Sequence, residues 1–447
     1  MKKWLCLCVC LLAAMLAAEE LQYSDYKFDF KPDKADAIYR CGEEIRFTGN
    51  VLVKGKTPEN MTVLCRILRD GLRTPVVSKK VVVSDKPIEF TAKLDKPGWV
   101  QLQVHVLDEK GAQLRMMGPK KRITAVYGGT GALVEPEKIT AGGPEPADFD
   151  AFWAAKRAEL DKVPVKELAK VEIPLPGKEA KTIACYDVKI ACAGGKPVSG
   201  YLCIPRNAKP KSLPAIVTYH GAGVRSANKP FWYAAYGMIA LDVNAHGIEN
   251  GKDAKFYSDL SAGELKNYWQ SGKTDRNQIY FVPMFLRVMR ALDYVKSLPE
   301  WDGRTLVVTG ASQGGSQSLA AAGLDPQVSL CVAAVPSLCD LGAGAVNRRP
   351  GGPLHSFPLE TQRDPALIRE AAYLDNVFFA KRIKCPIYLT AGLGDILTLV
   401  TSVYSFYNAL PEGTSKHVAI HPCYGHATPG SAPGRRAICE ALDMKNP

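Results

Sequence analysis

The segment LVVTGASQGGSQS, residues 306–318, is the most informative part of the chain. Its first four residues predict a short buried strand, and the run that follows its serine predicts a helix. A turn that joins a strand to a helix so tightly has no room for side chains two positions before and two positions after the serine. Gly310 and Gly314 occupy those two positions. The spacing therefore predicts a nucleophile elbow that presents the Ser312 hydroxyl at the carboxyl end of the strand.

Short apolar runs alternate with helical stretches on both sides of this elbow. A hairpin comes first, with arms at residues 182–191 and 198–205. The alternation predicts an α/β fold with a mostly parallel, helix-covered sheet, which we place at residues 166–447. The segment 336–384 is longer than a simple crossover and is expected to form a cap over the site. Further expected strands lie at residues 215–219, 238–243, 306–309, 330–335, 387–391 and 417–421.

The N-terminal third follows a different pattern, with short strands separated by turn signals. In residues 99–107, apolar and polar side chains alternate, which predicts a half-buried strand with His105 on its exposed side. Six or seven such strands without helical periodicity predict an immunoglobulin-like β-sandwich at residues 21–134. A connector follows at residues 135–165, where Asp148 is a good N-cap for a helix expected to pack on the α/β part.

The first residues of the chain have the pattern of a targeting segment. Lys2 and Lys3 precede an apolar run, residues 4–18, that is too short to span a membrane comfortably. A basic start, a short apolar core and small residues near Ala18 predict a signal peptide over residues 1–18. We therefore expect a secreted or periplasmic protein without a membrane span.

The composition excludes several classes of protein. With 47% apolar and 23% charged residues among 447, neither a collagen-like nor a wholly disordered chain is expected. The formal net charge is +12, but the basic pairs are short and far apart, so no nucleic-acid partner is expected. The 13 cysteines show no spacing typical of a zinc site, and no metal is expected. Cys41 and Cys65 are the one local candidate for a disulfide.

A serine hydroxyl becomes a good nucleophile only beside a base, and the base needs an acid to orient it. On this kind of fold the acid and then the histidine follow the serine along the chain. Asp395 comes just after the run 387–391, although it is also a candidate N-cap for the next helix. His426 lies in the loop beyond the last strand and is favoured as the base over His421, which ends that strand. Ser312, Asp395 and His426 are therefore the predicted catalytic residues.

The developing oxyanion needs two backbone N–H groups. One is expected from Gln313, directly after the nucleophile, and the other from Ala222, in the loop after residues 215–219. His220, in the same loop, is interpreted as a brace for it rather than a second base. His246 either lines the pocket or packs, so both histidines are candidate pocket residues. Five aromatic residues are candidates for stacking on a sugar or for ordinary packing: Trp232, Tyr233, Tyr257, Tyr268 and Trp269.

Several motifs together resemble the acetyl xylan esterase / cephalosporin C deacetylase family of the α/β-hydrolase superfamily. The resemblance covers roughly residues 145–447 and leaves the N-terminal sandwich as an addition. It implies an α/β-hydrolase fold and, without a cofactor, removal of acetyl groups from xylan fragments and other small acetylated compounds through Ser312, Asp395 and His426. The motifs are DFDAFW at residues 148–153, His220 with Gly221, GASQGG at 310–315, AGLGD at 391–395, and His426.

Three departures from the family pattern bear on the substrate and on the oligomeric state. Ala222 stands where the family usually has Tyr, Ala427 follows His426 in place of Glu, and residues 244–247 replace an Arg-Gly-Gln motif. We expect a secreted serine esterase that acts on acetylated polysaccharides or oligosaccharides, with a homo-oligomer left open. The alternatives are an α/β-hydrolase acting on another ester or a peptide, and a non-catalytic glycan-binding protein.

Overall fold

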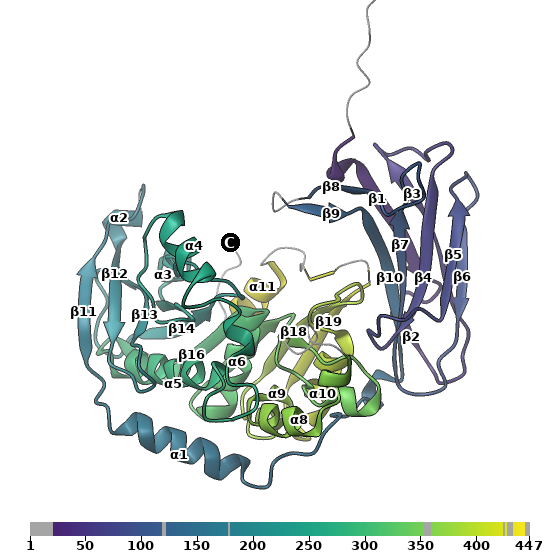
Figure 1. Ribbon diagram of the computed structural model, residues 1–447. Helices are drawn as coiled ribbons and strands as arrows, with labels where there is room; N and C mark the ends of the chain where they lie inside the picture. Colours follow the sequence, from purple (N-terminus) through teal and green to yellow (C-terminus); the bar gives the residue numbers. More distant parts are fainter. Residues whose placement is uncertain are drawn as a thin grey trace, which may run out of the picture.

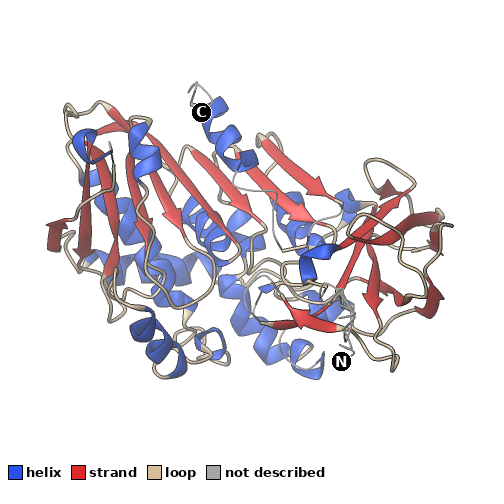
Figure 2. Cartoon of the chain, turned by 90° about the horizontal axis from the view of Figure 1, so that it is seen from above, coloured by secondary structure: helices blue, strands red, loops and turns tan. Residues whose placement is uncertain are grey.

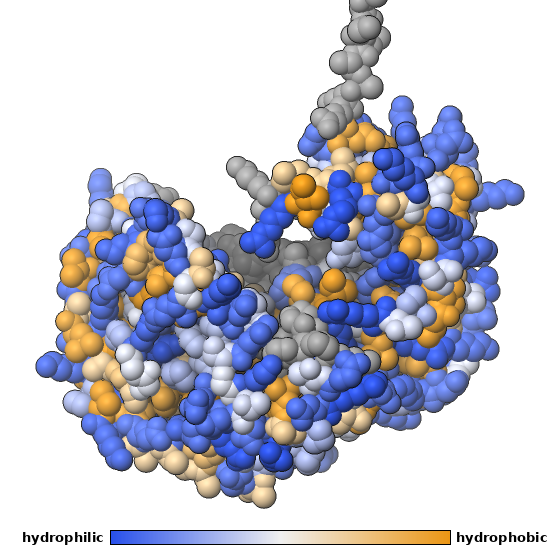
Figure 3. Space-filling model, in the orientation of Figure 1, coloured by the Kyte–Doolittle hydropathy of each residue, from blue (hydrophilic) through white to orange (hydrophobic). Residues whose placement is uncertain are grey.

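The computed structural model describes residues 21–118, 122–177, 179–352, 359–422, 425–426 and 432–442. A β-sandwich and a larger α/β part lie side by side, and helix α1 (Phe149–Asp161) runs along the larger part (Figure 1). The surface is hollowed between the two parts (Figure 3). The predicted leader, residues 1–18, lies outside the described residues. Within the described ranges, no helix is both long and apolar enough to cross a membrane.

The larger part is built on one twisted sheet of nine strands (Figure 2). Six neighbouring strands, from β15 to β19 in the sheet, run parallel, whereas β11, β12 and β13 pair antiparallel at one side. The predicted α/β fold with a mostly parallel sheet is confirmed. In sheet order the strands are β11 (Glu167–Glu172), β12 (Ile183–Ile190), β13 (Val198–Pro205), β15 (Ile239–Val243), β14 (Leu213–Tyr219), β16 (Trp301–Ala311), β17 (Leu330–Ala334), β18 (Ile387–Gly392) and β19 (Lys416–His421).

Helices cover both faces of this sheet, which is why its strands are apolar on both sides. In β14, Val217 packs into the core shared with α1, α5, α6, α9 and α10, and the next-door Ile216 packs on the opposite face with Ile438 of α11. Helices α1, α5, α6, α9 and α10 therefore lie on one face of the sheet, and α11 lies on the other. Besides α1, the helices are α2 (Glu179–Thr182), α3 (Phe231–Ala235), α4 (Ala254–Ala262), α5 (Phe281–Ser297), α6 (Gln313–Leu324), α7 (Leu359–Gln362), α8 (Pro365–Ala371), α9 (Asn376–Ala380), α10 (Val400–Ala409) and α11 (Ala432–Ala441).

The segment expected to form a cap belongs mostly to the helical layer. Its helix α9 packs between α6 and α10. A Cβ on Gly323 of α6 would lie 2.7 Å from the Cβ of Phe379, so the two helices approach each other as closely as glycine allows. Among the described residues of this segment, Ser337 and Gly352 line the cavity beside Ser312.

Two sheets packed face to face form the N-terminal sandwich, and Phe47 of one sheet shares a core with Val104 of the other. Cys41 and Cys65 are free thiols, so the suggested disulfide is wrong. The Cys41 thiol instead donates to a carboxylate oxygen of Glu135 at 3.3 Å. One sheet holds β1 (Tyr26–Pro32), β3 (Ile45–Val53) and β6 (Ile88–Ala92), the other β2 (Ile38–Tyr39), β10 (Tyr127–Val134), β7 (Gly98–Val106), β4 (Thr62–Arg69) and β5 (Val77–Val82), and a hairpin joins β8 (Arg115–Met117) to β9 (Ile123–Ala125).

Strand β7 is buried on both faces, contrary to the half-buried strand that its alternation predicts. Gln101 and His105, on its polar side, are 3% and 8% exposed. His105 stacks on Tyr127, and burial lowers the pKa of its imidazole to about 4. The prediction of a surface histidine was wrong, because Tyr127 and Gln103 of the sandwich itself lie against the His105 ring. Trp99, on the same side of β7, packs in the core of the α/β part.

Helix α1 begins directly after Asp148, as predicted, but the Asp148 side chain does not cap it. Its carboxylate accepts a hydrogen bond from the Tyr373 hydroxyl and pairs with Arg276 at 3.4 Å. The first residue of the helix, Phe149, packs edge to face on Phe379 with ring centroids 5.0 Å apart. The connector helix is therefore docked on the α/β part by aromatic packing and by the Asp148 carboxylate.

Candidate active site

Ser312 lies at the turn between β16 and α6. Its φ of 57° and ψ of −120° are outside the conformations that a side-chain-bearing residue favours, as is typical of a strained nucleophile elbow. A Cβ on Gly310 would lie 2.5 Å from the Gly314 carbonyl, and one on Gly314 would lie 2.0 Å from the Tyr219 carbonyl oxygen. The turn thus requires glycine at both positions, for the steric reason that the sequence pattern suggested.

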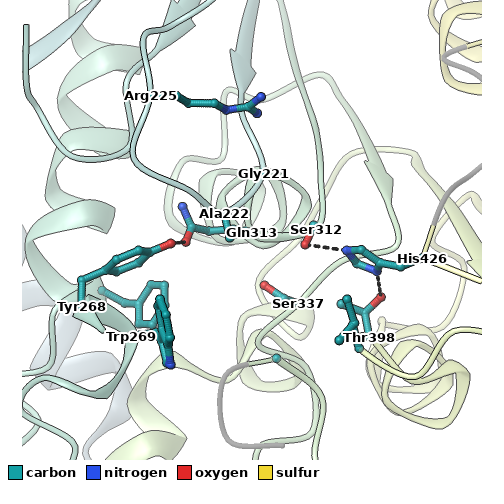
Figure 4. A pocket seen from close by; sticks show the side chains of 13 residues that line it. Gly221, Ala222, Arg225, Tyr268, Trp269, Ser312, Gln313, Ser337, Thr398 and His426 are labelled. Atoms are coloured by element: carbon teal, nitrogen blue, oxygen red, sulfur yellow. Dashed lines mark hydrogen bonds between the residues drawn. The ribbon is translucent and has the colours of Figure 1, made fainter. Parts of the chain in front are cut away.

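Two further side chains extend a hydrogen-bonded chain from Ser312. His426 Nε2 lies 3.0 Å from Ser312 Oγ (Figure 4), and His426 Nδ1 lies 2.9 Å from Asp395 Oδ2. Asp395 is fully buried, whereas the His426 side chain is 28% exposed. When Nδ1 donates its proton to the carboxylate, the Nε2 lone pair faces the serine hydroxyl. The residue that reaches Ser312 is therefore His426 and not His421.

The Asp395 carboxylate is held from both of its oxygens. Oδ1 accepts from the backbone N–H groups of Leu397 at 2.8 Å and Thr398 at 3.1 Å. Oδ2 accepts from the Thr398 hydroxyl at 2.6 Å as well as from His426. Asp395 thus binds the turn before α10, whose N-cap is Leu399, rather than capping that helix. Sequence reasoning missed Thr398, although its position three residues after the acid was an available signal.

A cavity of about 490 Å³ opens beside Ser312. Tyr268 and Trp269 form one wall (Figure 4), and Trp269 is 36% exposed. The expected oxyanion donors Gln313 and Ala222 both lie in the lining. The other described lining residues are Gly221, Arg225, Phe281, Ser337, Gly352, Leu397, Thr398 and His426.

His220 lies behind the cavity and joins two of its loops. Its Nε2 accepts from the backbone N–H of Ala245 at 3.1 Å, and its Nδ1 lies 2.7 Å from the Gly221 carbonyl oxygen, to which it donates. Burial lowers the pKa of the imidazole to about 4, so the ring is neutral at pH 7. His220 is absent from the described cavity lining, and its contacts are those of a brace for the loop.

His246 is fully buried and supports the aromatic wall. Its Nδ1 accepts from the Tyr280 hydroxyl at 2.8 Å, and its ring packs edge-on against Tyr268 with centroids 4.6 Å apart. The Tyr268 hydroxyl in turn donates to Gln313 Oε1 at 2.6 Å (Figure 4). Burial lowers the pKa of His246 to about 3, which keeps the ring neutral. Like His220, it lies behind the cavity wall and not in the described lining.

The chemistry that this geometry allows is nucleophilic acyl transfer. The imidazole of His426 lies within hydrogen-bonding distance of the Ser312 hydroxyl on one side and of the buried Asp395 carboxylate on the other, the arrangement of a nucleophile, a base and an orienting acid. Over the described part of the chain, no group of three or more His, Cys, Asp or Glu side chains is close enough to hold a metal ion.

The match to a protein family decides the class of this chain. The family model for acetyl xylan esterase (AXE1) matches residues 133–433, more than half of the sequence. The chain belongs to the acetyl xylan esterase family. It is therefore a carboxylic ester hydrolase with an α/β-hydrolase fold.

Individual members of the acetyl xylan esterase family match different extents of the chain. Acetyl esterase Axe7A of Xylanibacter ruminicola is 31% identical over 437 residues, 96% of this chain and 94% of the relative. The solved acetyl xylan esterase from Paenibacillus sp. R4 is 26% identical, with a TM-score of 0.59 over 69% of this chain and 98% of its own. Acetyl xylan esterase 1 from Thermoanaerobacterium sp. has the same fold, with 24% identity and a TM-score of 0.59 over 70% of this chain and 98% of its own. The two solved enzymes thus leave about 30% of this chain unmatched.

Proposed function

We propose that this protein is an exported serine esterase that removes acetyl groups from acetylated polysaccharides or from their oligosaccharides. The observation that carries the proposal is the hydrogen-bonded chain from Ser312 through His426 to the buried Asp395, beside an open cavity. Membership of the acetyl xylan esterase family supports the choice of the acetyl group.

In the proposed reaction, Ser312 Oγ attacks the acetyl carbonyl carbon while His426 Nε2 takes the hydroxyl proton. Asp395 holds the imidazole in the tautomer that accepts this proton and stabilises the imidazolium that forms. The backbone N–H groups of Gln313 and Ala222 bind the oxyanion. His426 then protonates the leaving sugar oxygen, and the C–O ester bond breaks. Water, deprotonated by His426, then attacks the acetyl-enzyme; the bond from the acetyl carbon to Ser312 Oγ breaks, His426 returns the proton to Oγ, and acetate leaves.

A sugar substrate is supported by the aromatic wall of the cavity. Trp269 presents an exposed face in the lining, and aromatic faces stack well on the apolar faces of sugar rings. Trp232, Tyr233 and Tyr257, the other aromatic candidates, are absent from the described lining. We therefore assign sugar contact to Trp269, because Tyr268 is only 3% exposed.

Replacing the nucleophile tests the proposal. Ser312→Ala should lower kcat for a small acetyl ester by about a thousandfold or more, because the remaining residues lack a nucleophile to activate. A fluorophosphonate should label the wild-type enzyme and leave the variant unlabelled. Wild-type-like turnover by the variant would contradict the assignment.

The substrate class is tested by comparing acetate release from acetylated xylan with release from other acetylated glycans. Butyryl, feruloyl and peptide substrates complete the panel. A preference for a butyryl, feruloyl or peptide substrate would favour an α/β-hydrolase that acts on another ester or on a peptide. Glycan binding without any turnover would favour a non-catalytic role. Export is tested by the N-terminus of the mature protein, which should be Glu19 in the extracellular or periplasmic fraction.

A further inference from the structure

The sandwich touches the α/β part at the two segments that carry the acid and the base. The Thr130 hydroxyl of β10 donates to the Pro422 carbonyl oxygen at 3.2 Å. Pro422 directly follows β19 and lies four residues before His426. Thr130 is completely buried, and the hydrogen bond itself is partly buried.

The next residue of the same strand lies against the acid-bearing loop. A Cβ on Gly131 would lie 2.6 Å from Trp99 Nε1, 2.8 Å from the carbonyl oxygen of Leu393 and 3.1 Å from the Leu393 Cβ. Leu393 is two residues before Asp395, and its backbone N–H donates to the His421 carbonyl at 3.1 Å. The absence of a side chain at residue 131 therefore allows β10 to approach the end of β18 directly.

A second contact lies on the other side of Asp395 in the chain. The turn residue Gly71, with φ of +71°, has its α-carbon so close to Leu399 that a Cβ would lie 2.6 Å from Leu399 Cδ1. The neighbouring Asp70 carbonyl accepts from the backbone N–H of Arg349 at 3.0 Å. Contacts of the sandwich thus lie on both sides of Asp395, at Leu393 and at Leu399.

We infer that the N-terminal sandwich helps to position the catalytic residues: Thr130 and Gly131 of β10 hold the segments that carry His426 and Asp395. This inference rests on the proposed function of the triad. Burial and, in smaller part, the charges of Tyr23 and Asp395 raise the pKa of the Tyr127 phenol, which places β10 within the electrostatic reach of the acid. Figure 1 shows β10 beside the end of the sheet that carries β18 and β19.

The sandwich residues that make these contacts lie outside the segment matched by the family model. The match begins at residue 133, inside β10, and therefore leaves Thr130 and Gly131 outside the matched segment. The two solved acetyl xylan esterases likewise match about 70% of this chain. The positioning role is accordingly inferred for this chain from its own contacts.

A pair of glycine variants on one strand tests the inference in the full-length enzyme. Gly131→Ala places a methyl group against Trp99 Nε1 and against the Leu393 carbonyl oxygen. It should displace Leu393 and lower kcat by about tenfold or more with KM changed less than threefold, since small displacements of catalytic groups cost that much. Gly128→Ala is the matched control, because its Cβ would meet Phe28 inside the sandwich at 2.4 Å. Both variants should lose thermal stability, and the control should keep its kcat. Equal kcat values for the two variants would overturn the inference.

The hydroxyl of Thr130 supplies a test that does not depend on a steric clash. Thr130→Val keeps the shape of the side chain, removes the donor to Pro422 and should lower kcat about fivefold, whereas Thr130→Ser should restore it. Equal kcat values for Thr130→Val and Thr130→Ser would overturn the inference, and this outcome can be read even if Gly131→Ala does not fold. Ser312→Ala distinguishes failure of the proposed function from failure of the positioning role. Activity in Ser312→Ala would refute the triad. An inactive Ser312→Ala together with an unaffected Thr130→Val would refute only the positioning role.

Discussion

Replacing Asp395 by asparagine should leave the loop after β18 in place and still remove nearly all turnover. The backbone N–H groups of Leu397 and Thr398 both donate to Oδ1. The asparagine side chain therefore keeps its carbonyl oxygen at that position, and its NH₂ group takes the place of Oδ2. That NH₂ group then faces His426 Nδ1, 2.9 Å from the position of the original oxygen.

The expected magnitude follows from the tautomer that this substitution imposes. The NH₂ group donates to Nδ1, so the imidazole proton must move to Nε2, which lies 3.0 Å from Ser312 Oγ. A protonated Nε2 is unable to accept the serine proton. In a serine protease the equivalent change costs about 10⁴ in kcat, and we expect about 10³–10⁴ here. That factor corresponds to about 4–5.5 kcal/mol in the activation free energy.

The assay is steady-state hydrolysis of p-nitrophenyl acetate near pH 7.5, with Tm measured on the same samples. Asp395→Asn should lower kcat while KM and Tm stay close to the wild-type values. Asp395→Ala is the comparison, because it removes the acceptor for both backbone N–H groups and should lower Tm as well. More than about a tenth of the wild-type kcat in Asp395→Asn would refute the assigned role of Asp395.

Three further predictions follow from other contacts in the site. Thr398→Val removes a donor to Asp395 Oδ2 and should lower kcat about tenfold with KM unchanged, and Thr398→Ser should recover most of the loss. Trp269→Ala should raise KM for acetylated oligosaccharides about tenfold and leave p-nitrophenyl acetate hydrolysis nearly unchanged; an equal effect on both substrates would argue against sugar stacking. Burial lowers the pKa values of His220 and His246 to about 4 and about 3, below the ordinary 6.5, so the stability that both contribute above pH 6.5 should be lost as the pH falls toward those values. Each histidine should lower the free energy of unfolding by about 1.4 kcal/mol for each pH unit that the pH falls between 6.5 and about 4. A free energy of unfolding that stays constant over this range would contradict the burial of neutral rings.

The elbow around Ser312 was predictable because its chemistry is local. Glycines two positions on either side of the serine are needed wherever a strand turns so sharply into a helix, and no distant contact changes that requirement. The alternation of apolar strands and helices likewise predicted the mostly parallel sheet. Since the carboxyl ends of parallel strands meet at one edge, the order of serine, acid and histidine along the chain was enough to select Asp395 and His426.

Residues that support the site from other parts of the chain were not predictable in this way. His246 was equally compatible with lining the pocket or packing, and its place behind Tyr268 depends on where the loop before α5 folds back. The polar side of β7 suggested solvent around His105, but the ring is buried against Tyr127 of the neighbouring strand β10. A local pattern reports how polar a face is, and not which other surface will be placed on it.

The order of motifs along the chain therefore predicted the fold, the class of reaction and the residues that the structure joins by hydrogen bonds, Ser312, His426 and Asp395, because each depends on spacing within a few residues of a strand end. The support of that triad by the sandwich emerged only from the folded molecule. The hydrogen bond from Thr130 to Pro422 joins residues 292 positions apart. The close approach of Gly131 to Leu393 is likewise not indicated by any pattern in the sequence around either residue. Contacts between segments so distant depend on how two separately formed cores dock, and short-range periodicity contains no information about that docking.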